Sequence, residues 1–255
     1  MTPVDYSVLD RPEISMNSFY PRRNWTSTPE GAEEHTIRVE EGVSLSCRFF
    51  PVGPASPTIL FFYGNGETAV EYDDIAPLYT QIGVNFFVAD YRGYGRSGGS
   101  PTFTTMLSDA RKALEALRII LRASQYGSRI FVMGRSMGRH PAFELAANSA
   151  DDLTGLIVES GRPSLGQFVY GLDTSEAERL EAAYQDKVRS INIPVLVIHG
   201  EMDTLAPVQQ AVNMYHSFAS QDKRLITIPG AGHNDLLYRG LQQYFTAIRN
   251  FVFPH

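Results

Sequence analysis

A serine between two glycines forms the most chemically suggestive motif of the chain, Gly134-Arg135-Ser136-Met137-Gly138, which fits the pattern G-x-S-x-G. The motif follows the apolar run 129–133 and precedes the helix-compatible segment 141–147. A tight turn from strand to helix strains the backbone at the serine and lifts its hydroxyl clear of the sheet. Glycines suit such a turn because a Cβ would collide with neighbouring backbone. We therefore predict Ser136 as a nucleophile.

A serine hydroxyl is a poor nucleophile without a base, and two loops further along the chain contain the residue types that it needs. The apolar run 195–199 leads into Asp203, and the run 224–228 leads into His233. The order serine, acid, histidine is the one that accompanies this kind of serine turn. We expect His233 to remove the proton of Ser136 and Asp203 to orient the imidazole.

Other carboxylates and histidines offer alternatives to this assignment. Glu201 lies near Asp203, and Glu159 ends another apolar run, which makes Glu159 the more serious alternative acid. Asp235 is too close in sequence to the candidate base to suit the loop geometry. His199 terminates an apolar run, which favours a packing or hydrogen-bonding role over that of the base.

The negative oxygen that develops when a serine attacks a carbonyl needs hydrogen-bond donors. We expect one donor to be the backbone N–H of Met137, directly after the predicted nucleophile. The other is expected in the loop Tyr63-Gly64-Asn65-Gly66, which follows the apolar run 58–62, and its position favours the backbone N–H of Asn65. A glycine-rich turn without a catalytic part is the alternative for this loop.

The composition describes an ordinary globular chain. Its 255 residues suit one sizeable domain, and 43% hydrophobic with 20% charged residues provide for a core without disulfide or metal staples. The net charge of −6 argues against a nucleic-acid-binding protein, which usually carries a basic field. Cys47 is the single cysteine, which excludes an intrachain disulfide and fits a packed strand thiol. We expect no metal and no other cofactor.

The N-terminus and the hydropathy pattern bear on location. The first residues, from Met1 to Tyr6, lack the charged start and the apolar run of a signal peptide. No uninterrupted apolar stretch approaches the roughly 20 residues that a membrane-spanning helix needs. We therefore expect a cytoplasmic protein without integral membrane association, acting on a small-molecule acyl substrate.

Short apolar runs alternate with segments of helical periodicity through most of the chain. The runs are 58–63, 84–89, 129–133, 155–159, 195–199 and 224–228. Apolar side chains recur at helical spacing from Leu107 to Leu121 and from Leu237 to Phe251. This alternation predicts an α/β fold with a mostly parallel central sheet and helices on both faces. In such sheets the functional site forms at the carboxyl ends of the strands, where the predicted catalytic residues fall.

The chain divides into an arm and one domain. We expect residues 1–34 to form an N-terminal arm over the domain, and residues 35–255 to form the domain itself. Segments 35–40 and 44–50 flank a Glu-Gly turn and predict a hairpin. An insert at about 164–190, rich in Glu and Ala, is either a short lid or an ordinary connecting helix.

A second glycine motif, Gly93 to Gly98, fits G-x-G-x-x-G after an apolar run, as a dinucleotide site would. Pro101 and a Ser/Thr-rich stretch follow, so no helix begins at the third glycine to hold a pyrophosphate. We interpret the segment as a structural loop near the rim of the site, braced by Asp90 and Arg92.

Several of these motifs together resemble the α/β-hydrolase superfamily, and specifically its BEM46-like branch, which includes the ABHD17-type and ABHD13-type hydrolases. The resemblance covers roughly Thr58 to the C-terminus. The segments and residues that carry it are 61–66, 90–99, 134–138, Asp203 and His233. It implies the α/β-hydrolase fold and hydrolysis of an ester, thioester or related acyl bond through an acyl-serine intermediate.

The sequence departs from that family at two points. Tyr63 stands where the family commonly has histidine, which leaves a backbone donor in place but is expected to alter the pocket wall. The arm has no cysteine cluster, so the lipid anchoring of ABHD17-like hydrolases is not expected.

The sequence is also compatible with two other functions. A peptidase or acyltransferase would use the same three residues, and a peptidase would favour an acidic pocket that holds a free substrate amine. A non-catalytic binding protein on a hydrolase fold belongs to a different class. The intact set of Ser136, Asp203 and His233 weighs against it.

Overall fold

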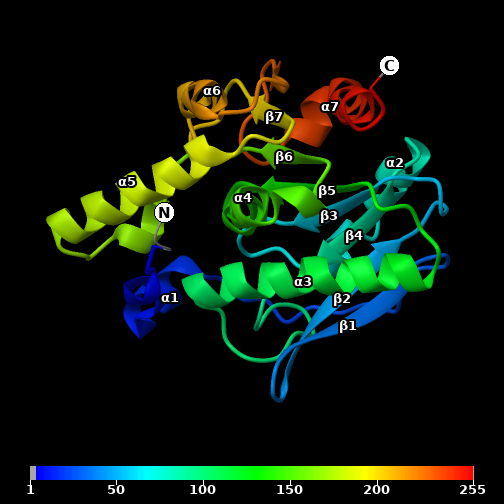
Figure 1. Ribbon diagram of the computed structural model, residues 1–255, viewed down its shortest axis with the longest axis horizontal. Helices are drawn as coiled ribbons and strands as arrows, with labels where there is room; N and C mark the ends of the chain where they lie inside the picture. Colours follow the sequence, from blue (N-terminus) through cyan, green and yellow to red (C-terminus); the bar gives the residue numbers. More distant parts are fainter. Residues whose placement is uncertain (1–3, 255) are drawn as a thin grey trace.

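A single sheet forms the centre of the molecule in the computed structural model, which describes residues 4–254 (Figure 1). Residues 1–3 of the predicted arm and residue 255 of the predicted domain lie outside the described residues. Within residues 4–254 the sheet has eight strands. They are β1 (Glu33–Glu40), β2 (Val43–Phe50), β3 (Thr58–Phe62), β4 (Asn85–Ala89), β5 (Ile130–Arg135), β6 (Gly155–Glu159), β7 (Val195–Gly200) and β8 (Lys223–Ile228).

The sheet is mostly parallel. Its strand order is β1-β2-β4-β3-β5-β6-β7-β8, in which β2 pairs antiparallel with both β1 and β4 and all other neighbours are parallel. Strands β3, β4 and β6 are buried at every position, because helices cover both of their faces. This burial explains their continuous apolar sequences. The predicted α/β architecture and the predicted hairpin of β1 and β2 are confirmed.

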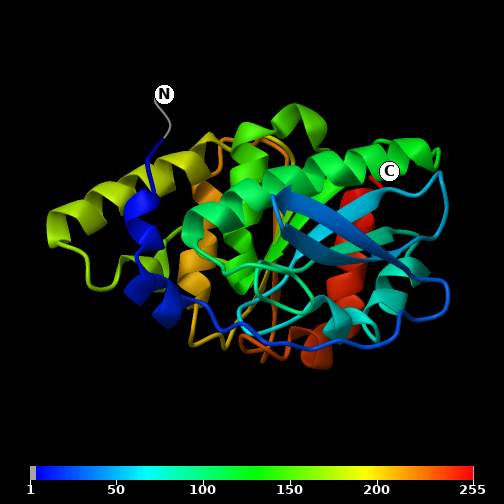
Figure 2. The same cartoon turned by 90° about the horizontal axis from the view of Figure 1, so that it is seen from below.

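Helices cover both faces of the sheet (Figure 2). The α-helices are α1 (Pro12–Ser18), α2 (Ala76–Gln81), α3 (Phe103–Ala123), α4 (Arg139–Asn148), α5 (Thr174–Ser190), α6 (Val208–Ser217) and α7 (Leu236–Val252). Helices α3 and α4 pack together on one face, whereas α2 and α7 meet on the other, where the hydroxyls of Tyr79 and Tyr244 lie 2.9 Å apart. Among the described residues, no helix is long and apolar enough to cross a membrane.

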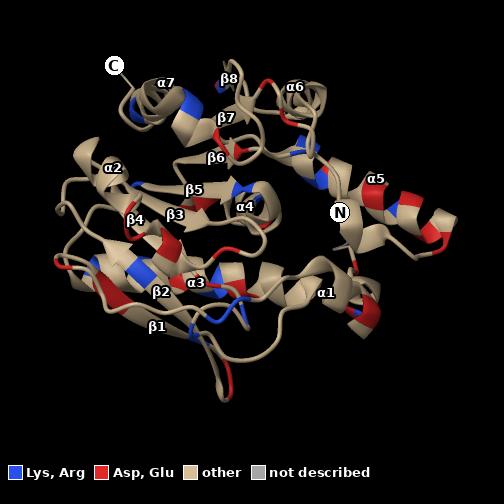
Figure 3. Cartoon of the chain, turned by 180° about the vertical axis from the view of Figure 1, so that it is seen from behind, with Lys and Arg blue, Asp and Glu red and all other residues tan. Residues whose placement is uncertain are grey.

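The segment between β6 and β7 packs against the body of the domain. It contains the 3-10 turn η5 (Gly166–Val169) and helix α5. Phe168 of η5 is fully buried, with its ring centroid 5.3 Å from that of Phe19 in the arm. The hydroxyl of Tyr184 in α5 lies 2.7 Å from Nδ1 of His140 in α4. Acidic and basic side chains are interspersed along α5 (Figure 3), whose apolar side faces the domain.

The arm is ordered along the carboxyl edge of the sheet. It contains the 3-10 turn η1 (Ser7–Asp10) and helix α1, and then runs past the loops that follow β3 and β4 before it enters β1 (Figure 2). Ile14 and Phe19 are buried. The N–H of Gly95 donates to the carbonyl of Arg22 at 2.9 Å. The arm therefore contacts the same edge of the sheet where the candidate site lies.

Candidate active site

Ser136 lies at the junction of β5 and α4, in the short 3-10 turn Ser136–Gly138. Its φ of +51° falls in the left-handed region, which residues other than glycine rarely adopt. A Cβ on Gly134 would overlap the carbonyl of Gly138, and a Cβ on Gly138 would overlap the carbonyl of Phe62 at the end of β3. The two glycines thus allow the serine turn to lie directly against β3, and the backbone conformation of Ser136 is the strained one that its motif predicts.

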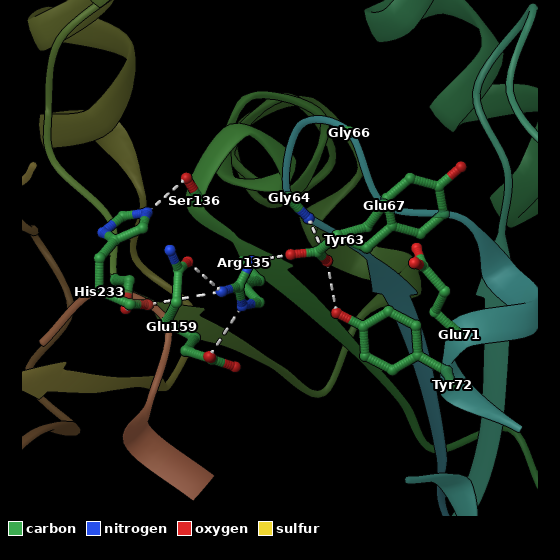
Figure 4. Close-up of polar contacts among 12 residues, drawn as sticks. Tyr63, Gly64, Gly66, Glu67, Glu71, Tyr72, Arg135, Ser136, Glu159 and His233 are labelled. Carbon is green, nitrogen blue, oxygen red and sulfur yellow. Dashed lines mark hydrogen bonds and ion pairs between the residues drawn. The ribbon is translucent and has the colours of Figure 1, made fainter. Parts of the chain in front are cut away.

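Three side chains from three separate loops form a hydrogen-bonded chain at the carboxyl edge of the sheet. Oγ of Ser136 lies 2.8 Å from Nε2 of His233 (Figure 4), and Nδ1 of His233 lies 2.7 Å from Oδ2 of Asp203. Distances of this length suit transfer of the hydroxyl proton to the imidazole. The loops after β5, β7 and β8 thus bring together the three residues that the sequence keeps far apart.

Hydrogen-bond donors surround the carboxylate of Asp203. Oδ1 accepts the backbone N–H groups of Leu205 at 2.9 Å and Ala206 at 2.7 Å, while Oδ2 faces His233 and lies 3.3 Å from Nε2 of His199. Burial alone would raise the pKa of Asp203, but the hydrogen bonds from the two histidines and the backbone outweigh it and hold the pKa well below its usual value. An ionised Asp203 favours the positive charge that His233 acquires with a proton.

The alternative residues contact other groups. His199 is fully buried, and its Nε2 donates to the carbonyl of Ala206 at 2.7 Å, which is the hydrogen-bonding role predicted for it. Glu159 accepts from Nε of Arg135 at 3.2 Å and from the hydroxyl of Tyr244 at 2.7 Å. The partners of the other two candidate acids are Thr227 for Glu201, and Gly232 and Arg239 for Asp235. Asp203 is the carboxylate that pairs with the imidazole of His233.

The loop after β3, which we call the oxyanion loop (residues 63–67), lies against the serine turn. The N–H of Gly64 donates to Oε2 of Glu67 at 3.0 Å, which closes the loop on itself. Within residues 4–254 no backbone carbonyl accepts the N–H of Asn65, whereas the side chain of Asn65 is bonded to the arm. The backbone N–H groups of Asn65 and Met137 stay the predicted donors to a developing oxyanion.

Arg135, directly before the serine, was not among the residues predicted to build the site. Its guanidinium forms ion pairs with Glu67 and Glu159, and Nη2 donates to Oδ1 of Asn234 at 2.8 Å and to the carbonyl of His233 at 3.4 Å (Figure 4). Burial opposes its charge, but the two carboxylates outweigh burial and raise the pKa of Arg135. This Arg135 cluster joins the serine turn, the oxyanion loop, the end of β6 and the loop that contains His233, which we call the histidine loop (residues 229–235).

A cavity of about 270 Å³ lies beside the Arg135 cluster, with α2 and the start of α7 completing its wall. Its acidic side chains are engaged within the protein. The hydroxyl of Tyr72 donates to Glu67 at 2.7 Å, and the hydroxyl of Tyr244 donates to Glu159. The carboxylates of Glu67 and Glu159 that line the cavity therefore already have partners.

Asp90 lies beneath the oxyanion loop and contacts the side chain of Tyr63, the first residue of that loop. The hydroxyl of Tyr63 donates to Oδ1 of Asp90 at 2.7 Å, and the N–H of Ala69 donates to the same oxygen at 2.8 Å. Burial raises the pKa of Asp90 to about 6. The prediction that Tyr63 alters the pocket wall is wrong, because its side chain has no exposed surface.

The second glycine motif forms a loop, as predicted. Gly93 and Gly95 have φ of +76° and +52°, and a Cβ on Gly95 would overlap the carboxylate of Asp90. Nε of Arg92 donates to Asp109 at 2.7 Å. Helix α3 begins only at Phe103, so the motif has no helix N-terminus at its third glycine.

The chain is similar to known proteins in sequence and in fold. A family model described as serine aminopeptidase, S33 (Hydrolase_4) matches residues 53–166 and 174–237. The chain is 33% identical over 233 residues to alpha/beta hydrolase domain-containing protein 17C of Xenopus tropicalis, with 88% of this chain and 70% of that protein covered. It is 32% identical over 204 residues to protein bem46 of Schizosaccharomyces pombe, with 77% of this chain and 67% of that protein covered.

Solved structures share the fold. The esterase Pf2001 of Pyrococcus furiosus superposes with a TM-score of 0.72 at 21% identity, covering 91% of this chain and 97% of the other. A soluble variant of monoglyceride lipase from Saccharomyces cerevisiae superposes with a TM-score of 0.69 at 17% identity, covering 91% and 97%. At these identities the similarity establishes the fold alone.

Proposed function

The chain belongs to the BEM46/ABHD17-type α/β-hydrolases of the Hydrolase_4 family, and from this premise we propose that it cleaves a carboxylic ester or thioester through an acyl-serine intermediate. One observation carries the proposal. Ser136, His233 and Asp203 are hydrogen-bonded in that order at the carboxyl edge of the sheet, with the serine backbone in a left-handed conformation. This arrangement supplies a nucleophile, a base and a group that orients the base.

Acylation of the serine follows from the two hydrogen bonds. Nε2 of His233 takes the proton of Ser136 as Oγ forms a bond to the carbonyl carbon of the substrate. The carbonyl oxygen becomes negative, and the N–H groups of Asn65 and Met137 are the donors proposed to bind it. When the tetrahedral intermediate collapses, the bond to the alcohol or thiol breaks. The leaving group receives the proton from His233, and the acyl group stays on Ser136.

Deacylation repeats the sequence with water. His233 removes a proton from a water molecule as its oxygen attacks the acyl carbon, and the proton then returns to Oγ of Ser136 when the carboxylic acid leaves. Asp203 remains ionised throughout, which agrees with its lowered pKa. Its carboxylate fixes the imidazole with Nε2 toward the serine in both halves of the cycle.

Labelling with a fluorophosphonate probe tests the proposal. We expect an adduct on Ser136, located by mass spectrometry, that is absent from Ser136→Ala. We also expect hydrolysis of short acyl esters or thioesters to fall by about 10⁶-fold in kcat in that variant. A folded wild-type protein that neither labels nor hydrolyses would contradict the proposal and favour a binding protein on a hydrolase fold.

The same three residues would serve an aminopeptidase, the activity in the description of the matching family. Such an enzyme needs an unpaired acidic group for the substrate amine. Here Glu67 and Glu159 are paired with Arg135, and Glu71 lies 2.7 Å from Arg22. This pairing favours the ester or thioester. Parallel assays of aminoacyl amides and short acyl esters separate the two, and faster cleavage of the amides would reverse the preference.

A further inference from the structure

The side chain of Asn65 joins the oxyanion loop to the N-terminal arm. Nδ2 of Asn65 donates to the carbonyl of Ser18 at 2.7 Å, and Oδ1 accepts the backbone N–H of Tyr20 at 3.0 Å. Phe19, between these two residues, has extended φ and ψ of −110° and 139°. In extended chain the carbonyl of one residue and the N–H two residues later point to the same side. The amide of Asn65 therefore pairs with the arm as a neighbouring strand would.

Further contacts strengthen this junction. The hydroxyl of Tyr94 donates to Oδ1 of Asn65 at 2.7 Å and also accepts the N–H of Tyr20 at 2.9 Å. Nη1 of Arg22 donates to the carbonyl of Gly66 at 3.0 Å, in the same loop. The oxyanion loop is thus hydrogen-bonded to the arm at two successive residues, Asn65 and Gly66.

The arm is itself fixed at both ends of this junction. On one side the ring of Phe19 is buried against Phe168 of η5. On the other side Gly95 donates to the carbonyl of Arg22, and Nη1 of Arg23 donates to the carbonyl of Ser97 at 2.6 Å. Residues 18–22 are therefore a rigid partner for the oxyanion loop.

The loop needs such a partner because of its own composition. Gly64 and Gly66 flank Asn65, and Gly66 has a φ of +79°. Glycine gives the backbone access to many conformations, so the direction of the Asn65 N–H is poorly set by the loop alone. An oxyanion donor accelerates acyl transfer only when it already points to where the charge develops. The side chain of the same residue is the only polar side chain within residues 64–66, and it is bonded to the arm.

We propose that residues 18–22 of the arm, which we call the bracket, position the oxyanion loop for catalysis, with the side chain of Asn65 as the contact. This inference rests on the proposed serine hydrolase function and adds a role for the arm. Ser18, Tyr20 and Arg22 are positioning residues that act through the loop and touch no reacting atom. The bracket affects the bound transition state more than the bound substrate, so its loss lowers kcat and leaves KM nearly unchanged.

A matched pair at Tyr20 tests the bracket without altering the loop. Tyr20→Pro removes the backbone N–H that Asn65 accepts, whereas Tyr20→Ala keeps it. The extended conformation of Phe19 is compatible with a following proline. We expect kcat for a short acyl ester to be about tenfold lower in Tyr20→Pro than in Tyr20→Ala, with KM within about twofold, because a misdirected donor loses part of its effect. Melting temperatures confirm that both variants fold.

Asn65→Ala removes every bond of that side chain, to Ser18, Tyr20 and Tyr94, and keeps the backbone N–H of residue 65. We expect a loss of kcat at least as large as that of Tyr20→Pro, and a combined loss in the double variant that is smaller than the product of the two single losses, because both changes break the bond between Asn65 and Tyr20. A folded Tyr20→Pro protein with the kcat of Tyr20→Ala would overturn the proposal. Additive losses in the double variant would overturn it as well.

Amide hydrogen exchange separates this proposal from the proposed function. In the Ser136→Ala background, which has no turnover, we expect the amides of residues 64–67 to exchange at least about tenfold faster with Tyr20→Pro than with Tyr20→Ala. Equal exchange would show that the bracket does not hold the loop. If the wild-type protein fails to label with fluorophosphonate but the exchange difference is present, the proposed function fails and the bracket remains as a structural contact.

Discussion

The two sides of the candidate site hold buried carboxylates whose pKa values are shifted in opposite directions. On the histidine side, Asp203 is 5% exposed and its pKa is lowered, because the donors around it outweigh burial. On the oxyanion-loop side, Asp90 is 3% exposed and its pKa is raised to about 6, because burial outweighs its bonds from Tyr63 and Ala69. Similar burial thus yields opposite shifts, and the number and kind of donors decide the sign.

The contrast teaches what each side contributes. An ionised carboxylate beside an imidazole stabilises the imidazolium that forms in each half of the proposed cycle. The carboxyl group of Asp90, beneath the oxyanion loop, holds the chain in place, because its Oδ1 accepts hydrogen bonds from the hydroxyl of Tyr63 and the backbone N–H of Ala69. We therefore expect Asp203 to affect the proton transfers themselves. We expect Asp90 to affect catalysis only through the position of the oxyanion loop.

Asp203→Asn gives the largest expected effect of the comparison. The amide neither carries the charge that favours the imidazolium nor enforces the tautomer with Nε2 free toward Ser136. We expect kcat for a short acyl ester to fall by about 10⁴-fold. Glu201→Gln is the matched control, because Glu201 lies in the same loop and bonds to Thr227, and we expect its kcat within about twofold of wild type. Equal effects of the two changes would contradict the assignment of the acid.

Arg135→Lys has an intermediate expected effect. The lysine keeps the positive charge but cannot reach Glu67, Glu159 and the histidine loop at once, since it lacks the planar fork of arginine. We expect kcat to fall about tenfold as the serine turn, oxyanion loop and histidine loop lose their common partner. The control is Arg96→Lys in the surface pair with Glu34. Unchanged kcat and unchanged fluorophosphonate labelling rate in Arg135→Lys would show that the cluster does not position the site.

Asp90→Asn is expected to change stability rather than turnover. Because the pKa of Asp90 is higher in the folded protein than its ordinary value of 3.8, the folded state binds more protons between about pH 4 and pH 6. The free energy of unfolding therefore falls as pH rises through that window, by up to about 3 kcal/mol from this group. An asparagine retains an oxygen for both donors and removes the ionisation.

Denaturant unfolding from pH 4 to pH 7 measures this contribution as the difference between variant and wild type. We expect the variant to gain stability relative to wild type as pH rises, and parallel profiles would contradict the raised pKa. The opposite sign applies to Asp203, whose lowered pKa contributes stability above about pH 4 that is lost as pH falls toward its folded value.

The positions of the strands along the chain were predictable because the pattern that marks a buried strand is local. Continuous apolar runs such as Gly155–Glu159 coincide with buried parallel strands, since helices cover both faces. The helices that contain 107–121 and 237–251 were predicted from their periodicity, and their observed bounds are Phe103–Ala123 and Leu236–Val252. The short helix α2 lacks a full amphipathic repeat and was not predicted.

The contacts of Arg135 and of the arm were not predictable in the same way. The partners of Arg135 include the carbonyl of His233, and those of Asn65 are the carbonyl of Ser18 and the N–H of Tyr20. Every residue has a backbone carbonyl and every residue except proline has an N–H, so these partners leave no pattern in the sequence. Likewise, the substitution of Tyr63 for histidine acts inside the fold and not at a pocket wall, which only its burial reveals.

The sequence by itself determined which three residues meet at the candidate site. A G-x-S-x-G turn after a strand, followed by an acid and a histidine after later strands, places Ser136, Asp203 and His233 at one edge of a parallel sheet, because parallel strands share their carboxyl ends. Only the tertiary structure decided how that edge is held. The raised pKa of Asp90, the Arg135 cluster and the bracket depend on burial and on partners from distant segments, and these exist only once the chain is folded.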